Sequence, residues 1–195
     1  MKPNYEKLFE ISEPQGGYFT TRQAEGAGYS RKDVSAQASR NKFTKIAYGI
    51  YRLTFYPYTE YEDLIIAVLK SGPAAVVSHD SALSVYRLSD ILPGIIHITI
   101  PKTRSRRHAG IKYHTCKISD QEITNFNSLP ITTVERTITD VIRSGLDNLL
   151  IEHAIEQAIT QGMVSTDSLT VQANRYGEKT KKELSKFLVR NNSDL

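Results

Sequence analysis

The hydrophobic positions at the start of the chain predict three short helices. Apolar side chains at helical spacing predict a first helix over residues 5–12. Two capping patterns follow, each a hydroxyl residue with Gln or Asp three positions later, and they predict helices that begin after Thr20 and after Ser30. Gly26 and Gly28 mark a tight turn between these two helices.

Two alternating apolar runs complete this N-terminal segment. Residues 43–46 and 50–53 alternate apolar and polar side chains around Gly49, which predicts a β-hairpin. A very short extended segment is expected at residues 17–19. The resulting order of helix, strand, helix, turn, helix and hairpin is that of a winged helix-turn-helix, which we place within residues 1–56.

The third predicted helix has the two faces that a recognition helix needs. On a helical projection, Val34, Ala38 and Asn41 share an inner face suited to packing. The opposite face is small, hydroxylated and cationic, which suits the major groove because Lys, Arg and Ser can contact phosphates or base edges. Lys45 and Tyr48 lie in or beside the hairpin turn, where a wing would meet DNA. The residues predicted to contact DNA are Arg22, Ser30, Arg31, Lys32, Ser35, Ser39, Arg40, Lys42, Lys45 and Tyr48.

The pattern changes from residue 60 onward. Longer amphipathic helices and isolated apolar strands predict a second, larger domain over residues 60–195, in which helices pack on a small β-sheet. Strands are expected at 95–100 and 111–118, with a short strand or turn at 74–78, and helices at 60–71, 79–88, about 134–143, 148–161, 165–176 and 178–190. The fold class predicted for the whole chain is therefore α+β.

Composition places the chain among ordinary globular proteins. Hydrophobic residues make up 39% of its 195 residues, enough to build buried cores. No apolar run approaches the roughly 18 residues needed to span a bilayer, and the first ten residues lack the apolar stretch of a secretory signal. Cys116 is the single cysteine, so no intrachain disulfide can form. These features together predict a cytoplasmic protein with no membrane partner.

Positive charge is concentrated in the predicted winged helix. The formal net charge of the chain is +4, which by itself is weak evidence for a nucleic-acid partner. Between Thr20 and Leu53, however, seven Lys and Arg residues accompany only two acidic residues, Glu25 and Asp33. Because this excess coincides with the predicted recognition helix and hairpin, it favours double-stranded DNA as the partner.

Several short motifs resemble the AbiEi abortive-infection antitoxins, which are the antitoxins of type IV toxin–antitoxin systems. Near the N-terminus, Gly17–Thr20, Gly28–Arg31 and Ala47–Leu53 are similar to the winged helix of that family. Farther along, the matching segments are Val77–Leu83 for its His-x-Ser-Ala-Leu helix start, Ile96–Pro101 for its central strand, and Ile131–Asp140 for its Thr-x-x-Glu-Arg-Thr-x-x-Asp helix. The resemblance covers most of residues 5–162.

The resemblance implies a division of labour between the two domains. The winged helix would bind inverted repeats in the protein's own promoter and repress it. The C-terminal domain would counter a nucleotidyltransferase-like toxin, without the two proteins needing to form a stable complex. Asn41 stands where such winged helices usually have Gly, and Asn can adopt the same backbone angles. The family also contains members without a toxin, so a stand-alone winged-helix regulator is the first alternative.

The residue types of a catalytic site are present, but their spacing does not favour catalysis. Ser78, His79 and Asp80 are adjacent and cannot converge as a hydrolase triad, so we interpret Ser78 and Asp80 as caps of the following helix. His97 and His114 each alternate with apolar neighbours, which is typical of lone structural histidines. The second alternative, a nucleic-acid-processing enzyme targeted by the winged helix, needs a carboxylate cluster that the sequence does not show. We therefore expect no enzyme activity, no catalytic residue, no metal and no cofactor.

Two features of the second domain are further candidates for a role. Arg136 and Asp140 are four residues apart on a predicted helix, which favours an ion pair that locks the structure. The loop between the two strands carries four cations within six residues and could contact DNA, RNA or an acidic partner. These possible contacts are Lys102, Arg104, Arg106 and Arg107.

Overall fold

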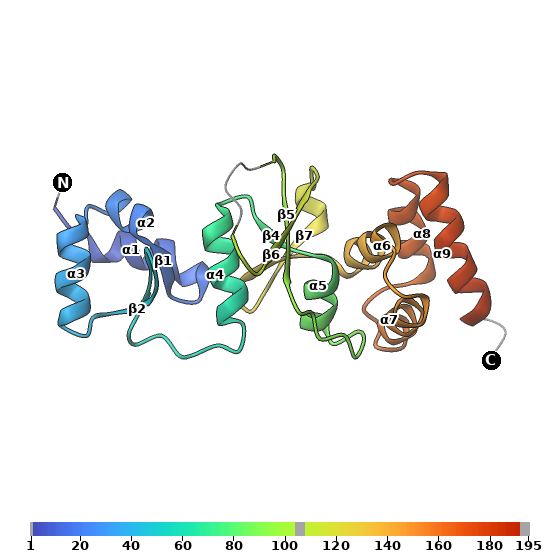
Figure 1. The fold of residues 1–195 in the computed structure, drawn as a ribbon, viewed down its shortest axis with the longest axis horizontal. Coiled ribbons are helices and arrows are strands. Elements are labelled where there is room, and N and C mark those ends of the chain that lie inside the picture. The colour runs from blue at the N-terminus through green and yellow to red at the C-terminus, as the bar shows by residue number, and fades with distance from the viewer. Residues whose placement is uncertain (1, 104–107, 192–195) are drawn as a thin grey trace. The chain divides into compact units, whose positions relative to one another are not determined.

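The computed structural model describes residues 2–103 and 108–191, and the side chains of all of these except 190 and 191. Helices and two β-sheets build an α+β fold, as predicted (Figure 1). The chain divides into two compact units. Unit 1 comprises residues 1–75 and 125–130, and unit 2 comprises residues 76–124 and 131–195.

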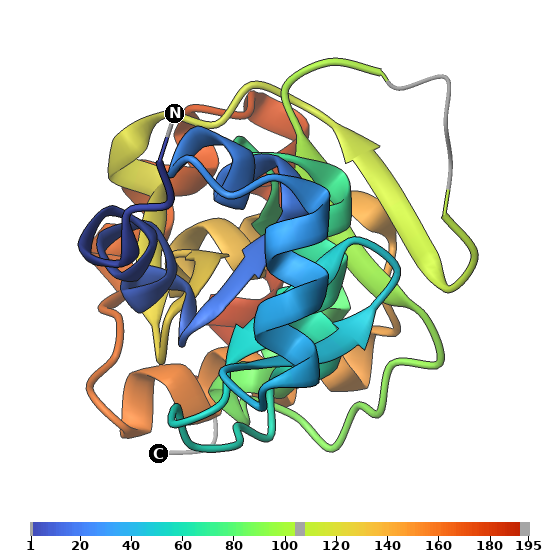
Figure 2. The same ribbon diagram turned by 90° about the vertical axis from the view of Figure 1, so that its left-hand side faces the viewer.

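Unit 1 contains the predicted winged helix, which Figure 2 views from the side of its third helix. Its elements are α1 (Tyr5–Ser12), the 3₁₀ turn η1 (Glu13–Gln15), β1 (Tyr18–Thr20), α2 (Thr21–Gly26), α3 (Arg31–Ser39), β2 (Phe43–Ala47) and β3 (Ile50–Leu53). The three strands form an antiparallel sheet in the order β1-β3-β2. The helices and the sheet enclose one apolar core, which includes Leu8, Phe19, Val34, Phe43 and Leu53.

The local signals of the sequence account for the helix boundaries of unit 1. Thr20 and Ser30 both form the predicted capping boxes, with Gln23 and Asp33 as their partners. Asn41 adopts the left-handed conformation, at φ 56°, as predicted for the residue that follows α3. Its assignment to the inner face was wrong, because α3 ends at Ser39 and the side chain of Asn41 is exposed.

Helix α4 (Glu62–Ser71) is counted with unit 1, whereas the predicted domain boundary lies before it, between residues 56 and 60. The hydroxyl of Tyr18 on β1 donates a hydrogen bond of 2.7 Å to Glu62, the first residue of α4. Burial and this carboxylate raise the pKa of Tyr18 to about 12, so the phenol stays protonated and keeps donating. That residues 1–56 form a domain of their own stays a prediction.

Gly28 provides a test of the packing of unit 1. Its φ is +89°, and a Cβ added there would lie 2.3 Å from the carbonyl oxygen of Lys2. Gly28→Ala should therefore lower the free energy of unfolding by about 1–3 kcal/mol. Gly26→Ala is the matched control, since its Cβ would meet nothing within 4 Å and Ala favours a helix by up to about 1 kcal/mol. Urea unfolding of both variants measures the difference, and equal stabilities would contradict the close approach at Gly28.

Unit 2 contains most of the second sheet, of which residues 125–130 are counted with unit 1. The strands of this sheet are β4 (Val76–Val77), β5 (Ile96–Ile100), β6 (Ile111–Thr115), β7 (Ile123–Phe126) and β8 (Leu129–Thr132), in the order β6-β5-β4-β8-β7. Strand β5 pairs antiparallel with β4 and parallel with β6. The β7–β8 hairpin was not predicted from the sequence. Its turn consists of Asn127 and Ser128, both with positive φ, which lack the Asn-Gly pattern that announces most such turns.

Five helices belong to unit 2 within the residues that the structure describes. They are α5 (His79–Tyr86), α6 (Val134–Ser144), α7 (Asn148–Thr160), α8 (Thr166–Asn174) and α9 (Glu178–Asn191), with the short 3₁₀ turn η2 (Asp120–Glu122) before β7. Helix α6 contacts the other four helices, and its residues from Arg136 to Ile142 are all buried. Because α6 is surrounded, the polar side chains in its sequence must find their partners inside the protein. Within the described residues, no helix combines the length and apolar character needed to cross a membrane.

Candidate nucleic-acid interface

A groove of about 580 Å³ lies between α2, α3 and the β2–β3 hairpin of unit 1. Three cationic side chains line it, namely Arg22 at the start of α2, Arg31 at the start of α3 and Lys45 on β2. Ser35 and Tyr48 complete the set of predicted DNA-contacting residues that the fold brings to this groove. The arrangement joins the recognition helix and the wing into one basic surface, which suits a phosphate backbone.

The tip of the hairpin is held in place although its outermost side chain is open to solvent. Tyr48 is 92% exposed, and Gly49 beside it has φ +73°, which makes the tight turn possible. The backbone N–H of Thr21 donates a 2.9 Å hydrogen bond to the carbonyl oxygen of Gly49. Because the turn is tied to the first residue of α2, Tyr48 is an aromatic side chain presented from a fixed position.

The outer face of α3 is exposed as predicted, at Lys32, Ser35, Ser39 and Arg40. Lys42, on the turn after α3, is also exposed. Apart from Ser35, these residues do not line the groove, and their contacts with DNA stay a prediction.

Two hydroxyls of the predicted interface are engaged within the protein. Ser30 donates a hydrogen bond of 2.6 Å to Asp33, and Ser39 donates one of 3.1 Å to the carbonyl oxygen of Ser35. The hydrogen bonds from the hydroxyl and the backbone N–H of Ser30 lower the pKa of Asp33. The Ser30 hydroxyl therefore caps α3, and a phosphate would have to compete with the Asp33 carboxylate for it.

The groove also contains a residue that the sequence analysis did not single out. Glu25 of α2 lines the groove and accepts a 3.3 Å hydrogen bond from Nε of Arg31. A helical projection of the six residues of α2 could have placed Glu25 beside Arg22, but the pairing with Arg31 depends on how α2 meets α3.

The other predicted contact site is the basic loop after β5. Lys102 is exposed there. Arg104, Arg106 and Arg107 lie outside the described residues, so the role of this loop stays a prediction.

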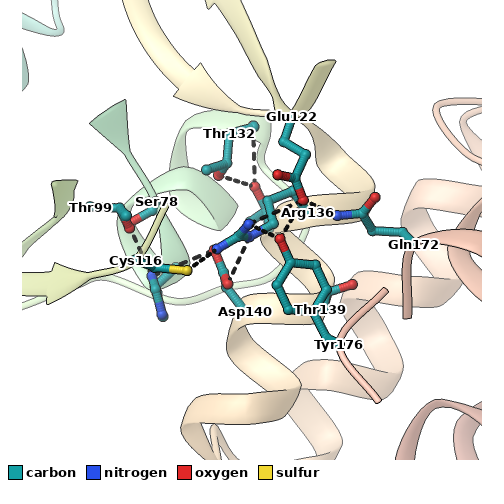
Figure 3. Close-up of polar contacts among 12 residues, drawn as sticks. Ser78, Thr99, Cys116, Glu122, Thr132, Arg136, Thr139, Asp140, Gln172 and Tyr176 are labelled. Atoms are coloured by element: carbon teal, nitrogen blue, oxygen red, sulfur yellow. Dashed lines mark hydrogen bonds and ion pairs between the residues drawn. The ribbon is translucent and has the colours of Figure 1, made fainter. Parts of the chain in front are cut away.

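Unit 2 holds a second arrangement of polar side chains, which is a buried network around Arg136 (Figure 3). The guanidinium donates to Asp140 at 2.9 Å through Nε and to Glu122 at 3.1 Å through Nη1. It also contacts the hydroxyl of Tyr176, and its Nη2 lies 3.5 Å from Sγ of Cys116. The predicted ion pair of Arg136 with Asp140 is thus confirmed as part of a larger network that joins α6 to η2, α8 and the chain after β6.

The two carboxylates of this network differ in their acidity. Burial opposes ionisation of Glu122, but hydrogen bonds from Tyr176, Ser119 and Gln172 outweigh it and hold the pKa at about 2. Burial raises the pKa of Asp140 to about 6, although the charge of Arg136 lowers it. At neutral pH both groups are ionised, and the single positive charge of the buried Arg136 is shared between them.

The prediction that His97 and His114 are lone histidines was wrong, because their rings lie close to each other and to His79. Their rings lie 5.1 Å apart between centroids, and the ring of His79 stacks on His114 at 3.5 Å. Burial lowers the pKa of His79 to about 2 and that of His114 to about 4, and it also lowers the pKa of His97. The three neighbours come from α5, β5 and β6, so only the packing of the helix on the sheet brings them together. Alternation along a single strand cannot show this.

Ser78 and His79 do not form a hydrolase-like relay. Nδ1 of His79 lies 3.0 Å from Oγ of Ser78 and 3.9 Å from Asp140, so one nitrogen faces both groups, whereas a triad uses the two ring nitrogens separately. Oγ of Ser78 is fully buried and accepts a 2.7 Å hydrogen bond from Thr99. The predicted cap was also wrong in part, because Ser78 occupies the N-cap position of α5 without a capping hydrogen bond from its side chain. Among the described residues, no group of three or more His, Cys, Asp and Glu is arranged to hold a metal ion.

Comparison with known proteins agrees with the geometry of unit 1. Residues 6–54 match the family described as "Transcriptional regulator, AbiEi antitoxin". No curated protein matches the chain. Among solved structures, the RV2827C protein from Mycobacterium tuberculosis is similar, with a TM-score of 0.52 and 13% identity over 93% of this chain and 74% of that one. At this identity the likeness shows the fold alone. Over residues 6–54, therefore, the chain is similar to the AbiEi antitoxin family of transcriptional regulators.

Proposed function

We propose that the protein is a DNA-binding repressor of its own operon and the antitoxin of a type IV toxin–antitoxin system. The observation that carries the DNA-binding part is the groove between α3 and the hairpin, with Arg22, Arg31 and Lys45 in its lining. A recognition helix with small outward side chains can enter the major groove, while Arg22 and Lys45 beside it neutralise phosphates. The operator we expect is an inverted repeat in the promoter of the gene itself.

The remaining parts of the proposal rest on the family match over residues 6–54. The partner toxin would resemble a nucleotidyltransferase and would be countered without a stable complex, in a cytoplasmic phage-defence setting. We propose no enzymatic activity for the chain. In support, the Ser78 hydroxyl is buried and the His79 nitrogen beside it also faces Asp140, so this group lacks the geometry of a catalytic relay.

Binding to the upstream region of the gene tests the role of the groove. The double variant Arg22→Ala/Lys45→Ala should bind this DNA at least about tenfold more weakly. The slope of log K against log salt should also become shallower by roughly 2, because two phosphate contacts are lost. Fluorescence anisotropy at several salt concentrations measures both quantities.

The matched control removes the same charge elsewhere. Lys179 and Lys182 are exposed on α9, and Lys179→Ala/Lys182→Ala should leave affinity and salt slope close to those of the wild type. If both double variants weaken binding equally, general charge and not the groove accounts for it. If the folded wild type shows no preference for the upstream region over scrambled DNA, the autorepressor proposal is wrong.

The neighbouring genes test the antitoxin part separately. A nucleotidyltransferase-like reading frame directly downstream should be toxic when expressed alone and tolerated when this protein is co-expressed. An isolated gene, or a harmless neighbour, would favour a stand-alone winged-helix regulator.

A further inference from the structure

The groove of unit 1 contains a carboxylate where a phosphate would be expected to approach. Glu25 lies in the lining together with the cations Arg22, Arg31 and Lys45. Its Oε1 is 3.3 Å from Nε of Arg31, and the two side chains are 45% and 82% exposed. A phosphate that enters this part of the groove therefore meets a negative charge next to Arg31.

The stability of the protein does not explain the position of Glu25. Ion pairs between side chains this exposed contribute little to folding, because water and salt screen them. The Glu25 carboxylate does, however, repel the negatively charged backbone of DNA. It opposes every DNA backbone equally, whatever the base sequence, and so weakens the binding that depends on phosphates alone.

The partner of Glu25 is well placed to read bases. Arg31 is the first residue of α3, and the N-terminal residues of a recognition helix are those that reach base edges in the major groove. A guanidinium bound through Nε to a carboxylate still presents its terminal NH₂ groups, and the planar fork of Arg matches the O6 and N7 acceptors of guanine. The carboxylate also restrains a long side chain that would otherwise sample many rotamers.

We propose that Glu25 is a specificity residue, which directs Arg31 toward a guanine edge and away from phosphates, and so exchanges overall affinity for sequence discrimination. This inference rests on the proposed DNA-binding function. It assigns to Glu25 a repulsive role in the discrimination between cognate and non-cognate sites.

The test compares Glu25→Gln with the wild type on the upstream region and on scrambled DNA of the same length. Removing one negative charge a few ångströms from the backbone should strengthen binding to scrambled DNA about fivefold. Binding to the upstream region should change less, because the loss of the Arg31 restraint offsets the gain. The ratio of the two affinities should therefore fall at least about threefold.

Glu10→Gln is the control for net charge, since Glu10 is exposed on α1 and does not line the groove. It should leave the ratio unchanged. Glu25→Ala should reproduce the result of Glu25→Gln, which excludes an effect peculiar to glutamine. Circular dichroism verifies that each variant is folded.

The outcomes separate this inference from the proposed function. A wild type that prefers the upstream region, together with a Glu25→Gln variant whose ratio is unchanged, would overturn the role of Glu25 and leave the proposed function intact. An equal gain on both DNAs would also overturn it, since it would show repulsion without discrimination. A wild type without any sequence preference would overturn both.

Discussion

Replacing Arg136 by methionine should lower the free energy of unfolding of unit 2 by about 3–5 kcal/mol. Methionine fills a similar volume, so the loss comes chiefly from Glu122 and Asp140, which would stay buried without a compensating cation. Arg136 is 1% exposed, and water cannot take over its hydrogen bonds unless the surrounding helices separate. Urea denaturation gives the free energy, and hydrogen exchange of the α6 amides assigns the effect to unit 2.

Arg143→Met provides the matched control for this prediction. The guanidinium of Arg143 lies 4.8 Å from the ring of Tyr176, close to the 4.6 Å of Arg136, but its side chain is exposed. Its removal should cost no more than about 1 kcal/mol. If Arg143→Met and Arg136→Met destabilise the protein equally, contact with the Tyr176 ring and not charge compensation is what matters.

A second substitution distinguishes charge from packing. Adding Glu122→Gln to Arg136→Met removes one of the uncompensated charges and should recover about 1 kcal/mol or more. In the wild-type background Glu122→Gln alone should be destabilising, because Glu122 accepts from Arg136, Tyr176 and Gln172. Simple addition of the two losses would contradict the view that Arg136 is needed to neutralise its neighbours.

Acidification should destabilise unit 2 well before ordinary carboxylates are protonated. The pKa values of His79, His97 and His114 all lie below 6.5, so the unfolded chain binds protons more readily than the folded protein. The stability that these neutral rings contribute is fully present above about pH 6.5 and is lost as the pH falls toward the folded-state values. For His79, with a pKa of about 2 in the fold, the loss at pH 4.5 is about 2–3 kcal/mol.

Other charged groups face the three rings and also affect how the stability of unit 2 changes with pH. Asp140, with its raised pKa of about 6, acts in the opposite direction, because the folded protein takes up this proton first. Asp80 lies 3.7 Å from His97 and raises its pKa, while Lys112 and Arg136 lower the pKa of His79. The pKa of Glu122 is lowered to about 2, so its contribution is lost only below the window considered. The three histidines together outweigh Asp140, so the free energy of unfolding of unit 2 should fall between pH 6.5 and 4.5.

The variant His79→Asn tests the origin of this pH dependence. Asn tolerates the positive φ of 52° at this position and does not titrate. Its free energy of unfolding should fall less steeply between pH 7 and 4.5 than that of the wild type, whatever its absolute stability. An unchanged slope in His79→Asn would show that the cluster does not cause the acid sensitivity.

Much of unit 1 could be predicted from the sequence because its elements depend on interactions between residues close in the chain. The capping boxes at Thr20 and Ser30 and the left-handed Asn41 each depend on residues within a few positions of one another. The same holds for the ion pair of Arg136 with Asp140, since side chains four positions apart are neighbours on one face of a helix. Such features need no knowledge of the rest of the chain.

Side-chain clusters that join distant segments of the chain could be identified only from the tertiary structure. The histidine cluster joins residues 18 and 17 positions apart, and Arg136 reaches Glu122 and Tyr176, which are 14 and 40 positions away. Glu25 faces Arg31 only because the turn at Gly28 sets α2 against α3. The sequence by itself determined the helices, the hairpin and the basic character of the winged helix, because these follow from short-range periodicity and capping. Packing alone decided which polar groups are buried together in unit 2. It also decided that the carboxylate of Glu25 lies beside Arg31 in the groove.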